Sequence, residues 1–88
     1  MSLTLKNSHR VAIQTRFYTT ANGAGKIKAW AYDREPVRVN YEYGGTFEEH
    51  ARAARAFLDK MGWEGTLYGG GSADGRGEVF VFVPEGSE

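Results

Sequence analysis

The sequence contains no cysteine, which excludes disulfide bonds, thiolate nucleophiles, zinc fingers and iron–sulfur clusters. It also has no excess of either charge, because eleven Lys and Arg residues balance eleven Asp and Glu residues. A net charge of zero argues against a protein whose main role is to coat polyanions. No apolar run approaches the about 20 residues that cross a bilayer. The first six residues lack the apolar core of a signal peptide, so we expect a cytoplasmic protein.

The residues that are present suffice for one small domain. The 88 residues are 41% hydrophobic and 14% aromatic, a composition that can build a core. We expect residues 1–10 to form a flexible or loosely docked tail, residues 11–84 the domain, and residues 85–88 a polar tail.

The charges are distributed unevenly along the chain. Residues 1–44 carry seven basic and three acidic side chains, whereas residues 45–88 carry four basic and eight acidic ones. Two interpretations stay open, namely attraction between two halves of one domain, or a basic face and an acidic face.

Three segments in the first half alternate apolar and polar residues with a period of two. This pattern predicts strands over residues 11–18, 26–32 and 37–43. Asn22-Gly23, between the first two segments, is typical of a tight turn because both residues tolerate positive φ. Short connections between the three strands predict an antiparallel meander.

A helix is predicted next, ending at Met61. Thr46 is a natural N-cap, and Glu49 three residues later completes a capping box. Gly62 is the expected left-handed residue beyond the helix, and Trp63 follows it as a Schellman ending prefers. Apolar residues recur at spacings of four and three and form one stripe, namely Phe47, Ala51, Ala54, Leu58 and Met61.

Two more strands are predicted after the helix. Residues 65–68 form a short strand that we expect to end at Gly69-Gly70-Gly71. Residues 78–83 are apolar on both faces, as is typical of a strand inside a sheet. The fold class is therefore α+β: an antiparallel sheet of four or five strands, in the order βββαββ, with one amphipathic helix packed on one face. The predicted core includes Ile13, Phe17, Ile27, Val39, Phe47, Ala54, Leu58, Met61, Val79 and Val81.

Signals for catalysis and for metal or cofactor binding are weak. Ala24-Gly25-Lys26 departs from a phosphate loop, because Thr20 and Ile27 stand where a glycine and a Ser or Thr belong.

The two histidines do not make a better site. His9 and His50 without thiols form a poor metal site, and we expect His50 at the boundary of the apolar stripe. We predict no catalytic residue, no metal and no cofactor.

One surface favours a binding role, and we call it the outer face. It carries basic and aromatic side chains from the first three predicted strands, namely Arg16, Tyr18, Lys26, Lys28, Trp30, Tyr32 and Arg38. Open sheets of this composition stack single-stranded bases, while Trp, Tyr and Arg also dominate protein interfaces. A third possibility is that the N-terminal tail or a partner subunit covers these aromatic side chains.

The sequence thus predicts a small non-enzymatic interaction module. It would bind a protein partner or itself through the outer face or through an edge strand. The alternative is a single-stranded nucleic-acid-binding protein that uses the basic and aromatic side chains of the outer face. We predict no membrane partner.

Several short segments resemble those of a known family. They are Ile13-Gln14-Thr15-Arg16, Lys26-Ile27-Lys28-Ala29, His50 with Ala53-Ala54, Lys60-Met61-Gly62-Trp63, Leu67 with Gly69-Gly70-Gly71, and Val79-Phe80-Val81-Phe82. Over about residues 11–83 the chain resembles a family of small uncharacterised proteins of bacteriophages, plasmids and bacterial genomes. The resemblance implies a mobile-element setting, a host or phage protein as partner and the cytoplasm of the host cell. It supplies no catalytic residue.

Overall fold

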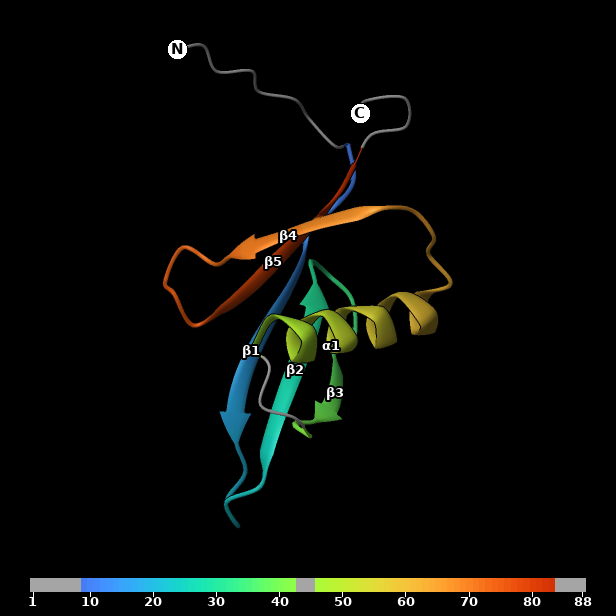
Figure 1. Cartoon of the computed structure of the whole chain (residues 1–88). Helices are drawn as coiled ribbons and strands as arrows, with labels where there is room; N and C mark the ends of the chain where they lie inside the picture. The colour runs from blue at the N-terminus through green and yellow to red at the C-terminus, as the bar shows by residue number, and fades with distance from the viewer. Residues whose placement is uncertain (1–8, 43–45, 84–88) are drawn as a thin grey trace, which may run out of the picture.

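The computed structural model describes residues 9–42 and 46–83, and within these ranges it contains five strands and one helix. They are β1 (Ile13–Thr19), β2 (Gly25–Ala31), β3 (Val37–Asn40), α1 (Thr46–Met61), β4 (Leu67–Gly71) and β5 (Gly77–Phe82). The strands form one antiparallel sheet in the order β3-β2-β1-β5-β4. The helix packs against one face of this sheet (Figure 1). The predicted α+β class and the βββαββ order are therefore confirmed.

Glycines at positive φ close two of the three hairpins, and Asp33 at φ 60° lies in the third. Gly23 adopts φ 88° between β1 and β2, and its N–H donates to the carbonyl oxygen of Thr20. Gly75 adopts φ 73° between β4 and β5, and its N–H donates to the carbonyl oxygen of Ser72. The turn predicted at Asn22-Gly23 is confirmed, because glycine reaches this backbone region without a steric penalty.

The end of α1 is the predicted Schellman motif. Gly62 has φ 71°, the N–H of Trp63 donates to the carbonyl oxygen of Leu58 at 3.1 Å, and the N–H of Gly62 donates to that of Asp59 at 3.3 Å. The turn brings the Trp63 ring against the rings of Phe57 and Phe82. The helix end is thus fixed to the core of the sheet.

At the other end of α1, Glu49 has a role that the sequence did not predict. Its carboxylate is buried and accepts hydrogen bonds from the backbone N–H of Glu42 and from Arg52. It therefore ties α1 to the chain that follows β3. The Thr46 side chain, the other half of the predicted capping box, lies outside the described residues.

The core lies between α1 and the inner face of the sheet. Its fully buried hydrophobic members are Ile13, Ile27, Ala29, Ala31, Ala53, Ala54, Phe57, Phe80 and Phe82. Of the predicted core residues, Ile13, Ile27 and Ala54 are confirmed as buried, whereas Val39, Leu58 and Met61 pack against the core at partial exposure.

The prediction was wrong for the core side of β5. Phe80 and Phe82 face the helix, and Val79 and Val81 lie on the opposite side of the sheet, where Val81 is exposed. The pairing of Phe80 with buried Ile13 on β1 fixes this parity. The two aromatic rings fill the space below α1, which two valines would leave partly empty.

Phe17 and Phe47 were also predicted to be buried, and both are exposed by more than two fifths. Phe17 shares the inner face with Ile13, but β1 and β2 extend past the helix (Figure 1). Its ring packs against the Tyr41 ring and close to Gly25. Phe47 lies in the first turn of the helix, and its ring packs against the Phe80 ring. The buried side of α1 is centred on Phe57, one residue before the predicted Leu58.

The observed strand bounds differ from the predicted ones by up to three residues, most at the ends of β3 and β4. The three glycines predicted to terminate a strand belong to β4, which runs from Leu67 to Gly71. Gly69 lies so close to the Phe80 and Phe47 rings that a Cβ atom there would stand 2.6 Å from Phe80. The third strand, β3, ends at Asn40, and Tyr43 lies outside the described residues.

Candidate binding face

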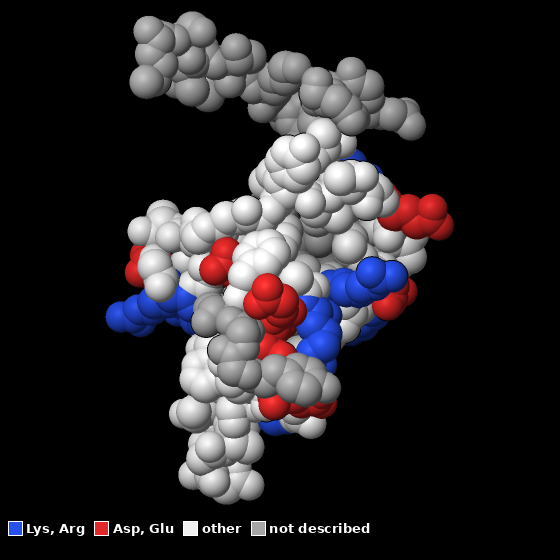
Figure 2. All heavy atoms as spheres, viewed as in Figure 1, with Lys and Arg blue, Asp and Glu red and all other residues white. Residues whose placement is uncertain are grey.

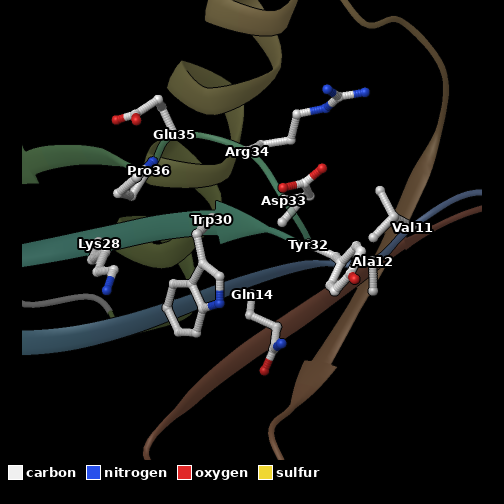
Figure 3. A pocket seen from close by; sticks show the side chains of 11 residues that line it. Val11, Ala12, Gln14, Lys28, Trp30, Tyr32, Asp33, Arg34, Glu35 and Pro36 are labelled. Carbon is white, nitrogen blue, oxygen red and sulfur yellow. The ribbon is translucent and has the colours of Figure 1, made fainter.

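The outer face is the side of the sheet opposite α1. Along β2, Ile27, Ala29 and Ala31 are buried below the helix, so the residues between them point the other way. Figure 3 shows Lys28 and Trp30 of β2 and Gln14 of β1 projecting from that side. The strand alternation predicted from the sequence therefore holds for β2 and brings its polar and aromatic side chains together.

The strand register places three cations in one row. Arg38 on β3 is the cross-strand partner of Lys28 on β2, and Lys28 is the partner of Arg16 on β1. Neighbouring strands are about 4.8 Å apart, so the row spans about 10 Å of sheet. These three side chains are separated by 10 and 12 residues in the sequence, and only the meander brings them into line.

A shallow hollow of about 300 Å³ lies on this part of the outer face. Its lining consists of Arg16, Tyr18, Lys28, Trp30 and Arg38. All five were predicted from the sequence as outer-face residues, and none of the described residues that line the hollow is a carboxylate. The lining combines guanidinium and ammonium groups with two aromatic rings, which suits a ligand that is both anionic and rich in planar rings.

The other two predicted residues flank this hollow. The Lys26 ammonium donates a hydrogen bond of 2.7 Å to the Asn40 side chain at the neighbouring strand position. Tyr32, just beyond β2, is 85% exposed and lines a larger hollow of about 710 Å³. Trp30 and Lys28 line both hollows, whereas Asp33 and Glu35 line only the larger one. The cationic hollow thus continues into a hollow of mixed charge.

Trp30 stands at the centre of these contacts. The Lys28 ammonium lies 5.0 Å from the centroid of its ring, which is within the range of a cation–π interaction. Trp30 also faces Gln14 across the β1–β2 pair. Partial burial by these neighbours holds the indole in place and leaves part of it open to a ligand.

Arg16 has a partner that the sequence did not reveal. The β4–β5 turn brings Asp74 to the middle of β1, where it forms an exposed ion pair with Arg16. Hydrogen bonds from the Ser72 hydroxyl and from the Arg76 backbone N–H hold the pKa of Asp74 below its ordinary value. The carboxylate is therefore charged at neutral pH and offsets part of the positive charge of Arg16.

The other end of the outer face is apolar. Tyr68 of β4 pairs with Val81 of β5, and their exposed fractions are 67% and 41%. Neither residue was predicted to belong to the outer face, because their place in it depends on the pairing of β5 with β1. The outer face therefore has a cationic end on β1–β3 and an apolar end on β4–β5.

The side of the molecule that carries α1 has a different charge pattern. Figure 2 shows acidic and basic side chains next to one another on that side. Two of the acids, Asp59 and Glu64, line a groove of about 500 Å³ between α1 and β4 together with Arg55. The opposite charges of this side are intermixed, in contrast to the cation row of the outer face.

His50 is buried, and its predicted boundary position is wrong. It is 4% exposed, and its Nδ1 atom lies 2.6 Å from the Thr15 hydroxyl oxygen in a shared hydrogen bond below α1. Burial lowers the pKa of His50, and the charges of Glu78 and Glu49 oppose this shift. The imidazole is therefore held neutral and serves the packing of α1 on β1.

The described residues contain no cluster of three or more His, Cys, Asp or Glu side chains that could hold a metal ion. Within residues 9–42 and 46–83, no helix is long and apolar enough to span a membrane. No protein-family model matches the sequence, and the comparisons with curated proteins and with solved structures gave no match. The resemblance to small phage and plasmid proteins stays a prediction.

Proposed function

We propose that this protein binds single-stranded nucleic acid on the cationic end of the outer face. The observation that carries the proposal is the hollow lined by Arg16, Tyr18, Lys28, Trp30 and Arg38. Cations that track phosphates, combined with aromatic rings on which bases stack, are the two requirements for binding of this type. The ligand class ranked second from the sequence thus becomes the first choice.

The zero net charge is a weaker objection once the charges are placed. Phosphates on the outer face would meet Arg38, Lys28 and Arg16 directly, whereas Asp59 and Glu64 lie on the α1 side. Interactions between exposed charges weaken beyond about 8 Å at physiological salt. The local charge of the hollow therefore matters more for binding than the sum over the chain.

We propose a binding role without catalysis. The hydroxyl–imidazole pair of Thr15 and His50 is buried below α1. A substrate would have to displace the helix to reach it. The Thr15–His50 pair is better explained by helix packing than by nucleophilic chemistry.

The test is the affinity for a fluorescently labelled single-stranded oligonucleotide of mixed sequence, measured by anisotropy at 50 and 150 mM salt. We expect binding that weakens as salt rises. Trp30→Ala should weaken it about tenfold through loss of stacking. Arg38→Ala should weaken it several-fold and reduce the magnitude of the salt slope by about 0.7.

The matched control is Arg55→Ala on α1, which removes the same charge from the other side of the molecule. This variant should bind like the parent protein. Equal losses for Arg38→Ala and Arg55→Ala, at unchanged thermal stability, would contradict a specific role for the outer face.

A protein partner is the second candidate, and the apolar end of the outer face favours it. Tyr68 and Val81 of this end expose ring and methyl surface away from the row of cations. Exposed Tyr side chains beside cations are typical of protein interfaces. If the parent protein fails to bind oligonucleotides even at 50 mM salt, this candidate takes first place. For either ligand we propose a cytoplasmic setting, in the host cell if the chain is phage-encoded.

A further inference from the structure

One edge of the sheet carries unpaired backbone groups and no charge. The Ser72 N–H donates to Gly77, and the Thr66 carbonyl accepts from Val83, so both residues bond to the β5 side. Antiparallel strands alternate this direction residue by residue. Leu67, Gly69 and Gly71 therefore direct their N–H and C=O groups to the free side of β4, where no described strand pairs with them.

The opposite edge of the sheet is protected. On β3, Arg38 and Asn40 project from the strand, and Asn40 also accepts hydrogen bonds from Lys26 and, through its carbonyl, from Arg52. Charged side chains on an edge strand are a common defence against pairing with another chain. On β4, the sequence Leu-Tyr-Gly-Gly-Gly offers no such defence.

We propose that β4 pairs antiparallel with β4 of a second copy of this chain, about a two-fold axis at Gly69. In this register, Leu67 lies opposite Gly71 of the other copy and Tyr68 opposite Gly70. Each bulky side chain covers a glycine, and a cross-strand aromatic compensates for the missing side chain of an edge glycine. Pairing at Leu67, Gly69 and Gly71 uses the backbone groups that the free edge leaves unpaired.

The charges at the two ends of β4 favour the same occupant. Glu64 precedes β4 and Arg76 follows it, and both side chains are exposed. Antiparallel pairing brings the 72–76 turn of one copy beside residues 64–66 of the other. The register places Glu64 opposite position 74 of the other copy, two residues from Arg76, so Glu64 can pair with Arg76 once at each end of the interface. Asp74 in the same turn is already paired with Arg16.

The helix does not obstruct this approach. A groove of about 500 Å³ separates α1 from β4 on the inner side of the sheet. A two-fold axis perpendicular to the sheet keeps both helices on one side and both outer faces on the other. The dimer would hold a continuous ten-stranded sheet. A strand-only interface is below about 1,000 Å², so we expect a weak, concentration-dependent dimer.

The register is tested by cross-linking, which is unambiguous because the natural chain has no cysteine. Tyr68→Cys and Gly70→Cys are prepared as separate proteins. In the proposed dimer, position 68 of one copy and position 70 of the other form a non-hydrogen-bonded pair. The Cα atoms of such a pair are about 4.5 Å apart, which allows a disulfide between two cysteines. Oxidation of the mixture should give the mixed dimer about tenfold faster than either variant alone gives its own dimer. Lys60→Cys on α1 is the control for random collision.

Sedimentation equilibrium of the parent protein up to 1 mM provides an independent measurement. We expect a monomer–dimer equilibrium for the parent protein. The double variant Tyr68→Lys/Gly70→Lys should abolish dimer formation, because like charges would face each other across the interface. The double variant Tyr68→Lys/Gly70→Glu should restore it. A strict monomer at 1 mM would overturn the proposed pairing, as would cross-linking of the mixture no faster than that of Lys60→Cys. Neither result bears on oligonucleotide binding, which a single copy can perform.

Discussion

Thr15 and His50 show how one buried polar pair can fix a helix on a sheet. The Thr15 hydroxyl contacts His50 and also the backbone of Glu78, so one side chain joins α1, β1 and β5. Buried polar groups are costly when they lose their partners. The pair therefore makes the position of α1 over β1 specific, in addition to the burial of Phe57.

The lowered pKa of His50 makes stability depend on pH. Because burial lowers this pKa in the folded state, the unfolded chain binds a proton at higher pH than the folded chain does. The contribution of neutral His50 to the free energy of unfolding is complete above about pH 6.5, and it declines as the pH falls from there through the lowered pKa. We expect a lower melting temperature at pH 5.5 than at pH 7.5, measured by circular dichroism.

His50→Gln should flatten this dependence, whereas His9→Gln, at an exposed position, should preserve it. The comparison concerns the change in melting temperature with pH, so a lower absolute stability of His50→Gln does not affect it. An unchanged pH dependence in His50→Gln would show that other groups cause it.

At this scale the sequence was informative wherever a residue's orientation followed from strand alternation. All seven predicted outer-face residues lie on that face or at its rim, because one period-two pattern fixes a whole strand. His50 could not be placed in this way. Its hydrogen-bond partner, the Thr15 hydroxyl, is 35 residues away in the sequence, and a local sequence pattern cannot predict such a long-range contact.

At the scale of elements, the junction between β1 and β5 depends on Gly77. This glycine begins β5 opposite Arg16, and a Cβ atom there would penetrate the backbone carbonyl of Thr15. A flexible side chain can move away from such a contact, but backbone in the middle of a sheet cannot. The close approach lets the β4–β5 turn reach Arg16.

Gly77→Ala should therefore destabilise the fold by about 3 kcal/mol in chemical denaturation. Gly71→Ala is the matched control, because a Cβ atom there meets no heavy atom within 4 Å. Both substitutions reduce the entropy of the unfolded chain equally, so their difference isolates the steric cost. We expect Gly71→Ala to stay within about 0.5 kcal/mol of the parent or to stabilise it. Equal stabilities would contradict the close approach.

The order of elements could be predicted from the sequence, but the order of strands in space could not. Periodicity and turn residues identified five strands and one helix, and the Schellman ending was correct to the residue. The insertion of β5 between β1 and β4 depends on long-range pairing. That pairing decides whether Val79 or Phe80 faces the core, since both are strongly apolar and local pattern favours neither.

At the scale of the whole molecule, the zero net charge conceals a separation of charges. Seven basic and three acidic residues fall in the first half of the chain, which supplies β1–β3 and hence the cationic hollow. Most of the described acids belong to α1 and the segments after it. Of the two interpretations left open by the sequence, the row of Arg38, Lys28 and Arg16 supports a basic surface on part of one face.

Two substitutions that each remove one negative charge test this separation. Asp74→Asn releases Arg16 from its ion pair and should strengthen oligonucleotide binding about threefold or more at 50 mM salt. Asp59→Asn, on α1, makes the same change in net charge and should alter the affinity by less than about twofold. Equal gains for the two variants, in the same anisotropy assay, would show that net charge governs binding.

Within the part of the chain that the structure describes, α1 covers one side of the sheet, so alternate residues of β1 and β2 face the core and the outer face. Ile27, Ala29 and Ala31 hold the fold together, while Lys28 and Trp30 between them contribute little to the core. Random substitution of the chain should therefore give two separable classes of variants along one strand. Changes at the core-facing positions would reduce the yield of folded protein. Changes at the positions between them would alter ligand preference without loss of protein. Such a strand allows new specificities to be selected without rebuilding the domain.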